Sequence, residues 1–182
     1  ELVEAFSLER VSKAGAKFDA DKTRWFQQQY LRSTDNALLA KELKTQQGLT
    51  EDLSYLEKVC NVMKERATFV KDIYTEGDYF FQAPSDYDET VLKKKWKEDT
   101  HQIMTDWLNI LKDIEPFNAS NVENAFKNYL TEIDKGIGAV LPAFRLLVTG
   151  KAMGPSMFEI VEILGKEESV NRMEVGLQKI TA

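Results

Sequence analysis

Carboxylates are the most plentiful side chains that could do acid–base chemistry, 30 in all, beside one histidine and one cysteine. The carboxylates recur at the spacing of helix surfaces, without a paired histidine, cysteine or serine elbow. His101 lies among polar neighbours, which is more typical of a surface position than of a general base. One histidine, even with Cys60, supplies too few ligands for a structural zinc site. The sequence therefore predicts no catalytic residue and no metal site.

Groups that could bind a ligand gather in the stretch 141–165, LPAFRLLVTGKAMGPSMFEIVEILG. Pro142 and Pro155 suit the first turns of two short helices, where no backbone N–H is needed. Gly150 and Gly165 suit the left-handed positions just past the helix ends. The second helix is apolar on most of its surface, so we expect it to be buried and to hold the preceding loop rigidly. Free N–H groups and the positive end of a helix dipole would face outwards there, which predicts a binding site.

The elements that must hold this loop are all helical. Only four prolines and nine glycines interrupt good helix formers, and no alternating strand pattern lies between turn signals. The sequence indicates an all-α protein with an irregular connection up to Phe18. Helices are expected at about 22–32, 35–47, 50–70, 89–116 (continuous or restarting near 99), 120–136, 142–150, 155–164 and 166–180.

Two helical subdomains are predicted, at residues 1–84 and 85–182, because Gly77 and Pro84 break the helical pattern. Three consecutive aromatic residues lie at this boundary: Tyr79, Phe80 and Phe81. We expect them to pack between the subdomains; the alternative is that they stack on bases.

Two further groups have a structural and a functional interpretation. Lysines at 93, 94, 95 and 97 form a basic run, for which a solvated helix face is favoured over a functional role. Cys60 lies within an apolar stripe that includes Leu56 and Met63, which favours core packing over reactive chemistry.

Composition and charge limit the class of protein. With 182 residues, 43% hydrophobic and 30% charged, the chain can bury a core in one or two domains. No apolar run approaches the roughly 20 residues that span a bilayer, and the N-terminus has no signal architecture, so a cytoplasmic location is expected. A net charge of −6 argues against nucleic-acid binding by bulk electrostatics. The segment 10–24 nevertheless carries five basic and two acidic residues, a local net charge of +3.

Blocks at both ends of the chain carry a family resemblance. The run FRLLVTG at 144–150 is followed by GP at 154–155, MFE at 157–159 and LGKE at 164–167. Their order and spacing resemble the C-terminal end of bacterial glutamyl-tRNA synthetases, which are class I aminoacyl-tRNA synthetases. A second block, FSLERVSK at 6–13, resembles the segment that follows the catalytic body of that family. The resemblance covers essentially the whole chain.

The resemblance implies an anticodon-binding region made of two α-helical bundles, with residues 1–18 as a remnant of the connection to the catalytic body. The family's ATP site needs a two-histidine signature and a Lys-x-Ser-Lys loop, whereas this chain has one histidine, and Val11-Ser12-Lys13 lacks the leading lysine. The implied parent protein is a glutamate–tRNA ligase that uses ATP and Mg. This chain alone is expected to be inactive, to hold no cofactor, and to bind the anticodon loop of tRNA(Glu) as a monomer.

By resemblance, tRNA anticodon recognition falls to Arg66, Arg145, Gly154, Pro155 and Met157. Some relatives have threonine where this chain has Gly154, which removes a hydroxyl but leaves a backbone contact possible. For Arg145 the alternative is an ion pair at the helix end with Glu159 or Glu162.

Arg66 lies in the block VMKER at 62–66, which matches a helix where the family has an arginine that checks the third anticodon base. Cytosine, the third base of the glutamate anticodon, offers acceptors to a guanidinium, whereas guanine, in the glutamine anticodon, presents donors. An unpaired buried donor costs about 1–3 kcal/mol, roughly ten- to hundredfold in affinity. The resemblance thus implies an enzyme that rejects the glutamine tRNA. Read without the family, Arg66 is one exposed helix arginine among many, and the alternative function is a freestanding helical protein-interaction module.

Overall fold

The computed structural model describes residues 2–7 and 18–180, which contain helices, turns and loops and no strand. The all-α class is confirmed for these residues, and no helix among them is long and apolar enough to span a membrane. The irregular connection and the basic residues expected between positions 8 and 17 lie outside the described residues. The elements are α1 (Leu2–Ala5), α2 (Ala20–Ser33), α3 (Asn36–Gln47), α4 (Leu53–Met63), α5 (Val70–Glu76), the 3-10 helix η2 (Asp78–Phe80), α6 (Glu89–Lys95), α7 (Thr100–Asp113), α8 (Ala119–Glu132), α9 (Ile137–Thr149), α10 (Met157–Leu164) and α11 (Lys166–Lys179).

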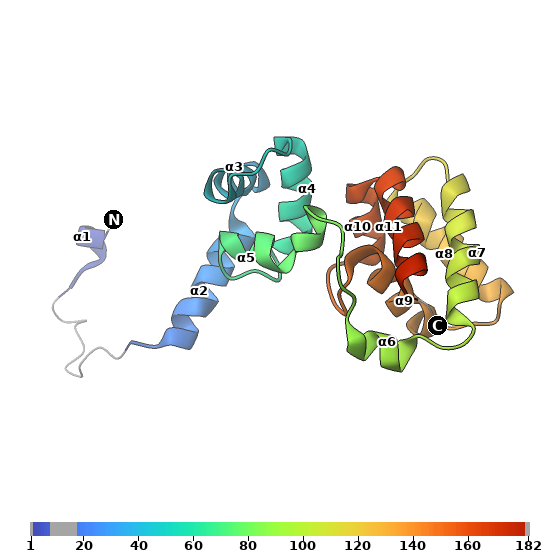
Figure 1. Ribbon diagram of the computed structural model, residues 1–182. Helices are drawn as coiled ribbons and strands as arrows, with labels where there is room; N and C mark the ends of the chain where they lie inside the picture. Colours follow the sequence, from blue (N-terminus) through green and yellow to red (C-terminus); the bar gives the residue numbers. More distant parts are fainter. Residues whose placement is uncertain (1, 8–17, 181–182) are drawn as a thin grey trace.

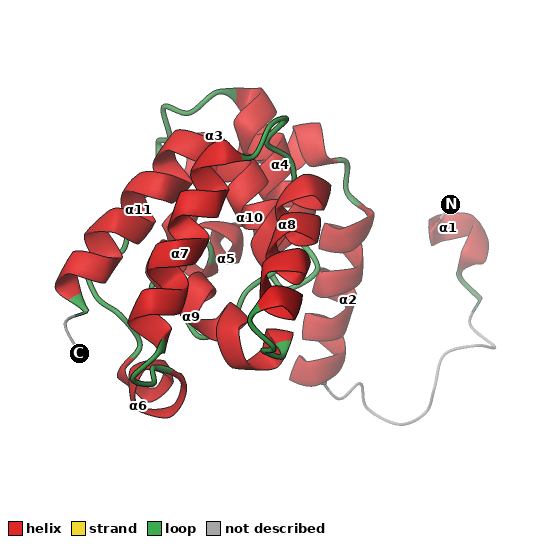
Figure 2. Cartoon of the chain, turned by 90° about the vertical axis from the view of Figure 1, so that its right-hand side faces the viewer, coloured by secondary structure: helices red, strands yellow, loops and turns green. Residues whose placement is uncertain are grey.

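Apart from α1, the helices gather in two groups (Figure 1). Helices α2 to α5 form one group, and α6 to α11 form the other, with the segment 77–88 running between them. Helix α10 contacts α4 and η2, so the two groups meet through α10. Figure 2 shows the second group from its outer side, where α7 lies between α11 and α8.

The prediction of one continuous helix over residues 50–70 is wrong, because the chain forms α4, a turn at residues 64–69, and then α5. The Asp72 carboxylate accepts hydrogen bonds from the backbone N–H groups of Thr68 (3.0 Å) and Phe69 (2.8 Å). A local side-chain acceptor of this kind competes with the helical bonding pattern. As a result, Arg66 lies on the turn and not on a helix.

The expected helix ends near the binding loop are partly wrong. Helix α9 begins at Ile137, so Pro142 lies inside the helix, and Pro155 precedes the first residue of α10 by two positions. Gly150 has the expected left-handed conformation, with φ 71°. It must be small as well, because a Cβ there would lie 2.6 Å from the Asp86 carbonyl oxygen.

The cores of both groups are dense. In the second group Trp107, Phe126 and Phe144 are fully buried, and their rings contact one another at centroid distances of 4.8 to 5.6 Å. Cys60 is fully buried in the first group, which confirms its role in core packing. Tyr79 and Phe80 are buried too, which confirms packing over base stacking for these two rings.

A buried arginine on α11 ties these elements together. The Arg172 Nη1 group donates hydrogen bonds to the carbonyl oxygens of Tyr79 (2.6 Å) and Val148 (3.2 Å). Its Nε pairs with the Glu168 carboxylate at 2.6 Å. The Tyr55 hydroxyl donates to the next carbonyl along η2, that of Phe80, at 2.6 Å. Thus η2 is held by both helical groups.

Trp25, Phe26, Tyr30 and Leu31 predict a one-sided apolar face on α2, but most of this face is exposed. Leu31 is buried, but Trp25, Phe26 and Tyr30 are 53%, 46% and 69% exposed. Among the residues described here, α2 is held mainly at its second half, where Arg32 donates to the Glu65 carbonyl oxygen.

The buried Cys60 and Tyr79 and the half-buried Tyr55 make the stability of the fold decrease at alkaline pH. Burial raises the pKa of Cys60, Tyr55 and Tyr79 to about 12. The unfolded chain releases these protons near the ordinary values, 9.0 for cysteine and 10.0 for tyrosine, while the folded chain keeps them. Their stabilising contribution is therefore complete below about pH 9 and decreases as the pH rises towards 12.

We expect the urea midpoint of unfolding to fall between about pH 9 and pH 11. The decrease should be smaller in a Cys60→Val variant, which lacks one of the three groups. A midpoint that stays constant over this range would contradict the assignment.

Candidate nucleic-acid interface

Four of the five predicted site residues meet at the loop between α9 and α10. Arg145 lies on the last turns of α9, Gly154 and Pro155 lie in the loop, and Met157 begins α10. The Arg145 Nη2 group donates to the Pro155 carbonyl oxygen at 2.7 Å. This bond fixes the guanidinium against the loop.

The contact between Arg145 and Gly154 depends on the absence of a side chain. A Cβ at Gly154 would lie 2.8 Å from the Arg145 Nη1 atom and 3.2 Å from the Tyr79 hydroxyl oxygen. The Nη1 atom is itself buried and has no acceptor within the described residues. Since buried donors are nearly always paired in native proteins, this Nη1 group lacks a partner that an acceptor from outside these residues would supply.

Arg66, the fifth residue, lies close enough to this cluster to act on its charges. Burial lowers the pKa of Arg145, and the charge of Arg66 lowers it further. Tyr79, whose pKa burial raises, responds to both arginines. Arg66 is exposed on its turn, and the charges of two arginines from different helical groups both lower the pKa of one buried tyrosine.

The alternative for Arg145, an ion pair with Glu159 or Glu162, is wrong. No ion pair of Arg145 occurs in the described part of the chain, and Glu162 accepts a hydrogen bond from the Ala119 backbone N–H instead, at 3.2 Å. Both carboxylates are exposed. The charge of Arg145 is therefore not neutralised by a carboxylate among the described residues.

Two of the predicted site residues, Pro155 and Met157, shape the loop through packing and backbone groups. Met157 is 1% exposed and Pro155 is buried, so neither presents its side chain to a ligand in this conformation. By contrast, Met153 in the same loop is 79% exposed and was not predicted. Its position next to Gly154 makes it an apolar surface against which a base could pack. The sequence contained a signal for this exposure, because a methionine beside a glycine in an expected loop has no hydrophobic core to pack against.

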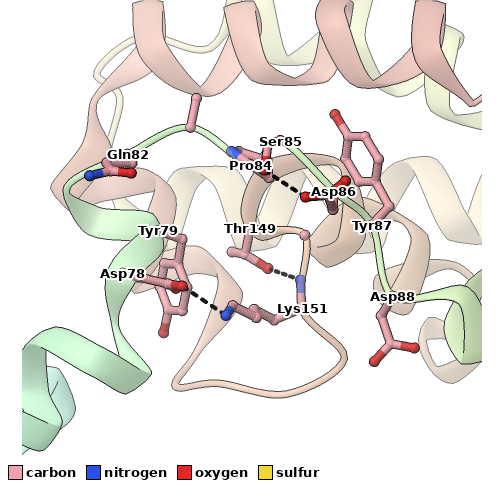
Figure 3. A pocket seen from close by; sticks show the side chains of 12 residues that line it. Asp78, Tyr79, Gln82, Pro84, Ser85, Asp86, Tyr87, Asp88, Thr149 and Lys151 are labelled. Atoms are coloured by element: carbon pink, nitrogen blue, oxygen red, sulfur yellow. Dashed lines mark hydrogen bonds and ion pairs between the residues drawn. The ribbon is translucent and has the colours of Figure 1, made fainter.

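The loop is fastened to the segment between the two helical groups (Figure 3). The Lys151 Nζ group pairs with the Asp78 carboxylate at 2.8 Å, and the Asp88 N–H donates to the Gly150 carbonyl oxygen at 3.0 Å. A hollow of about 440 Å³ lies between residues 78–88 and 149–151. Three of its lining residues are acidic, Asp78, Asp86 and Asp88, which makes it unsuited to a phosphate.

Sequence reasoning missed Arg172 and Tyr79 as supports of this site. Arg172 could have been found, because it shares the spacing of the buried face of α11 with Ser169, Met173 and Gly176. No group of three or more metal-ligating side chains occurs among the described residues. Within those residues the arrangement fits recognition of a ligand by hydrogen bonding.

Comparison with known proteins gives a family. Residues 23–177 match the family described as the anticodon binding domain. The chain is 44% identical to the glutamate–tRNA ligase of Flavobacterium johnsoniae over 183 residues, and 37% identical to that of Amoebophilus asiaticus. These alignments cover 99% and 98% of the chain, and 36% of each relative. The chain thus spans about a third of the length of the relatives that it matches.

Solved structures agree with the sequence comparison. The glutamate tRNA ligase from Elizabethkingia meningosepticum superposes with a TM-score of 0.90 at 33% identity, over 97% of this chain and 36% of that one. The glutamate-tRNA synthetase from Elizabethkingia anophelis superposes with a TM-score of 0.86 at 32% identity, over 95% of this chain and 34% of that one.

Proposed function

Because this chain belongs to the anticodon binding domain family, we propose that it binds the anticodon loop of tRNA(Glu) as part of a glutamate–tRNA ligase. The observation that carries the proposal is the Arg145 guanidinium, which is anchored on one nitrogen by Pro155 and has a buried, unpaired donor on the other. A single-stranded RNA loop presents unstacked bases whose acceptors such a donor can bind.

We propose that the longer parent protein is a glutamate–tRNA ligase. It would join glutamate to tRNA(Glu) with ATP and Mg bound outside this chain, in the cytoplasm, while this chain alone would act as an inactive, metal-free monomer. We propose residues 1–84 and 85–182 as the two anticodon-binding subdomains. Arg66 belongs to the first subdomain and Arg145 to the second, so bases would be read on both sides of the junction.

The roles of the site residues follow from their exposure. Arg145 would donate to one base from its fixed position beside Gly154, while the exposed Arg66 would donate to the third anticodon base. Met153 would provide apolar surface for a base. Pro155 and Met157 would shape the loop through backbone and packing. Base edges can thus be recognised despite the net charge of −6, because hydrogen bonds to splayed bases need only a local basic surface.

The test is a titration of this chain with tRNA(Glu) at low salt, beside the same tRNA with its third anticodon base changed from cytosine to guanine. Low salt preserves phosphate contacts that would otherwise be screened. Tighter binding to the cytosine form is expected. Equal binding of the two forms would contradict base discrimination by this chain, and absence of binding would favour the protein-interaction alternative.

We expect Arg66→Gln to remove most of the preference for cytosine over guanine at the third position. The glutamine amide offers both a donor and an acceptor, so guanine no longer faces only donors. The ratio of the two dissociation constants should fall by roughly tenfold or more. Arg24→Gln, on the exposed side of α2, is the matched control and should keep the wild-type ratio. An unchanged ratio in Arg66→Gln would remove the assignment.

We expect Gly154→Ala to weaken tRNA binding without unfolding the chain. The added Cβ would force the end of the Arg145 side chain away from its present position, since the two would be only 2.8 Å apart. Loss of one charge-assisted hydrogen bond costs about 1.5–3 kcal/mol, so affinity should fall roughly tenfold or more. Gly136→Ala is the control, because a Cβ there meets no atom within 4 Å. Equal affinity of both variants would show that the position of the guanidinium is unimportant.

A further inference from the structure

A second groove lies between α6 and the end of α11. It has a volume of about 620 Å³, and its apolar floor is formed by Tyr87, Leu92, Trp96 and Ile180. Helix α6 and the end of α11 lie side by side in both views (Figures 1 and 2). The Trp96 Nε1 atom is buried and has no acceptor within the described residues. The groove thus presents an aromatic and apolar surface, while the Trp96 Nε1 group itself is not exposed in it.

Lysines from both elements converge on this groove. Lys97 follows α6, Lys179 ends α11, and both line the groove and are exposed. Neither forms an ion pair with the carboxylates of the described chain, whereas Lys93 is paired with Glu89 at 2.8 Å. Asp86 and Glu98 also line the groove, and Asp86 accepts a hydrogen bond from the Ser85 hydroxyl. Lys94 and Lys95 lie alongside on α6, also exposed and unpaired in this part of the chain.

The groove is close to the anticodon site. Asp88, the N-cap of α6, donates its N–H to Gly150 at the start of the loop. Helix α6 has seven residues, so it spans only about 10 Å from that point to the groove at its other end. An RNA molecule bound at the loop therefore has the groove within reach.

We infer that this groove is a second RNA contact, in which Lys97 and Lys179 bind phosphates and Trp96 supports a base or ribose. Charge favours RNA: the two lysines lack protein counterions, although the chain as a whole is acidic. Stacking of bases on aromatic rings beside basic side chains is the usual mode of sequence-tolerant binding to single strands. The inference rests on the proposed function, and it adds binding that is independent of the anticodon sequence.

The experiment measures the affinity of this chain for tRNA(Glu) as a function of salt concentration. In Lys97→Gln/Lys179→Gln, loss of two phosphate contacts should make the slope of log K against log salt shallower by about 1.4. The preference for cytosine at the third anticodon position should stay at the wild-type ratio. The control is Lys41→Gln/Lys58→Gln, which removes two exposed lysines from α3 and α4 and should keep the wild-type slope.

The outcomes separate the two proposals. Absence of tRNA binding by the wild-type chain would contradict the proposed function, and the groove contact with it. Wild-type binding with the same slope in the groove variant would contradict the groove contact alone. Titration with polyglutamate tests whether an acidic protein occupies the groove instead of RNA. An acidic protein would be the partner if the groove variant, but not the control variant, lost polyglutamate binding while its tRNA slope stayed at the wild-type value.

Discussion

Replacement of Arg172 by methionine is expected to lower the free energy of unfolding by at least about 1–3 kcal/mol, the cost of leaving a buried acceptor without its donor. Arg172 is 4% exposed and bonds to two carbonyl groups and one carboxylate. Methionine would fill much of the space but would leave the Tyr79 and Val148 carbonyl oxygens without this donor. Unfolding by urea, followed by circular dichroism, measures the effect.

The matched control is Arg24→Met on α2. Arg24 is 64% exposed and lies 3.9 Å from the Asp21 carboxylate, so its loss should change stability by less than about 1 kcal/mol. Similar effects of the two substitutions would show that the buried hydrogen bonds of Arg172 contribute little. Arg172→Lys should be intermediate, because lysine keeps the charge but cannot reproduce the planar guanidinium fork.

Replacement of Arg145 by lysine is expected to reduce the affinity for tRNA(Glu) by roughly tenfold to hundredfold, from the loss of a charge-assisted hydrogen bond of about 1.5–3 kcal/mol. The guanidinium donates to the Pro155 carbonyl oxygen through Nη2 and leaves Nη1 unpaired, so in the proposed complex a base that reached Nη1 would be bound without loss of the Pro155 bond. A lysine ammonium carries its three donors on one nitrogen and cannot reproduce the planar, forked geometry of the guanidinium. The charge is unchanged, so bulk electrostatics do not contribute to the loss.

The measurement is a low-salt titration of Arg145→Lys, with Arg24→Lys as the control and with the urea midpoint of both variants determined. A midpoint near that of the wild type establishes that the variant is folded. Retention of wild-type affinity by folded Arg145→Lys would contradict the role assigned to the guanidinium. If the urea midpoint of Arg145→Lys fell far below that of the wild type, the loss of affinity would come from unfolding, and Arg145 would be a structural residue.

Much of the helical pattern could be predicted because it depends on local signals. Gly48 and Gly150 end α3 and α9 in the left-handed conformation, and Asp19 begins α2 by accepting the Lys22 N–H. Helix α10 is buried through Met157, Phe158, Ile160 and Val161, as its apolar surface predicts. These signals act within one turn of the chain, so sequence spacing is sufficient to find them.

The errors occur where a short-range side-chain bond interrupts a helical pattern, or where residues distant in the sequence decide the packing. The apolar stripe of α4 continues in sequence to Val70, but Asp72 binds the backbone N–H groups that a longer helix would need. The aromatic residues of α2 follow helical spacing, which does not say what they pack against. The site residues could be named only by family resemblance. Their juxtaposition, including the contact between Arg145 and Gly154, depends on how α9 and the loop fold back on each other.

The exposed rings of α2 also determine how the chain behaves at high concentration. Trp25, Phe26 and Tyr30 form an apolar surface that favours self-association, while the net charge of −6 keeps copies apart by repulsion. Acidification protonates the carboxylates and removes that repulsion, but it leaves the rings unchanged. The colloidal stability of this chain is therefore set by its surface carboxylates, and its solubility should be lowest in mildly acidic buffer.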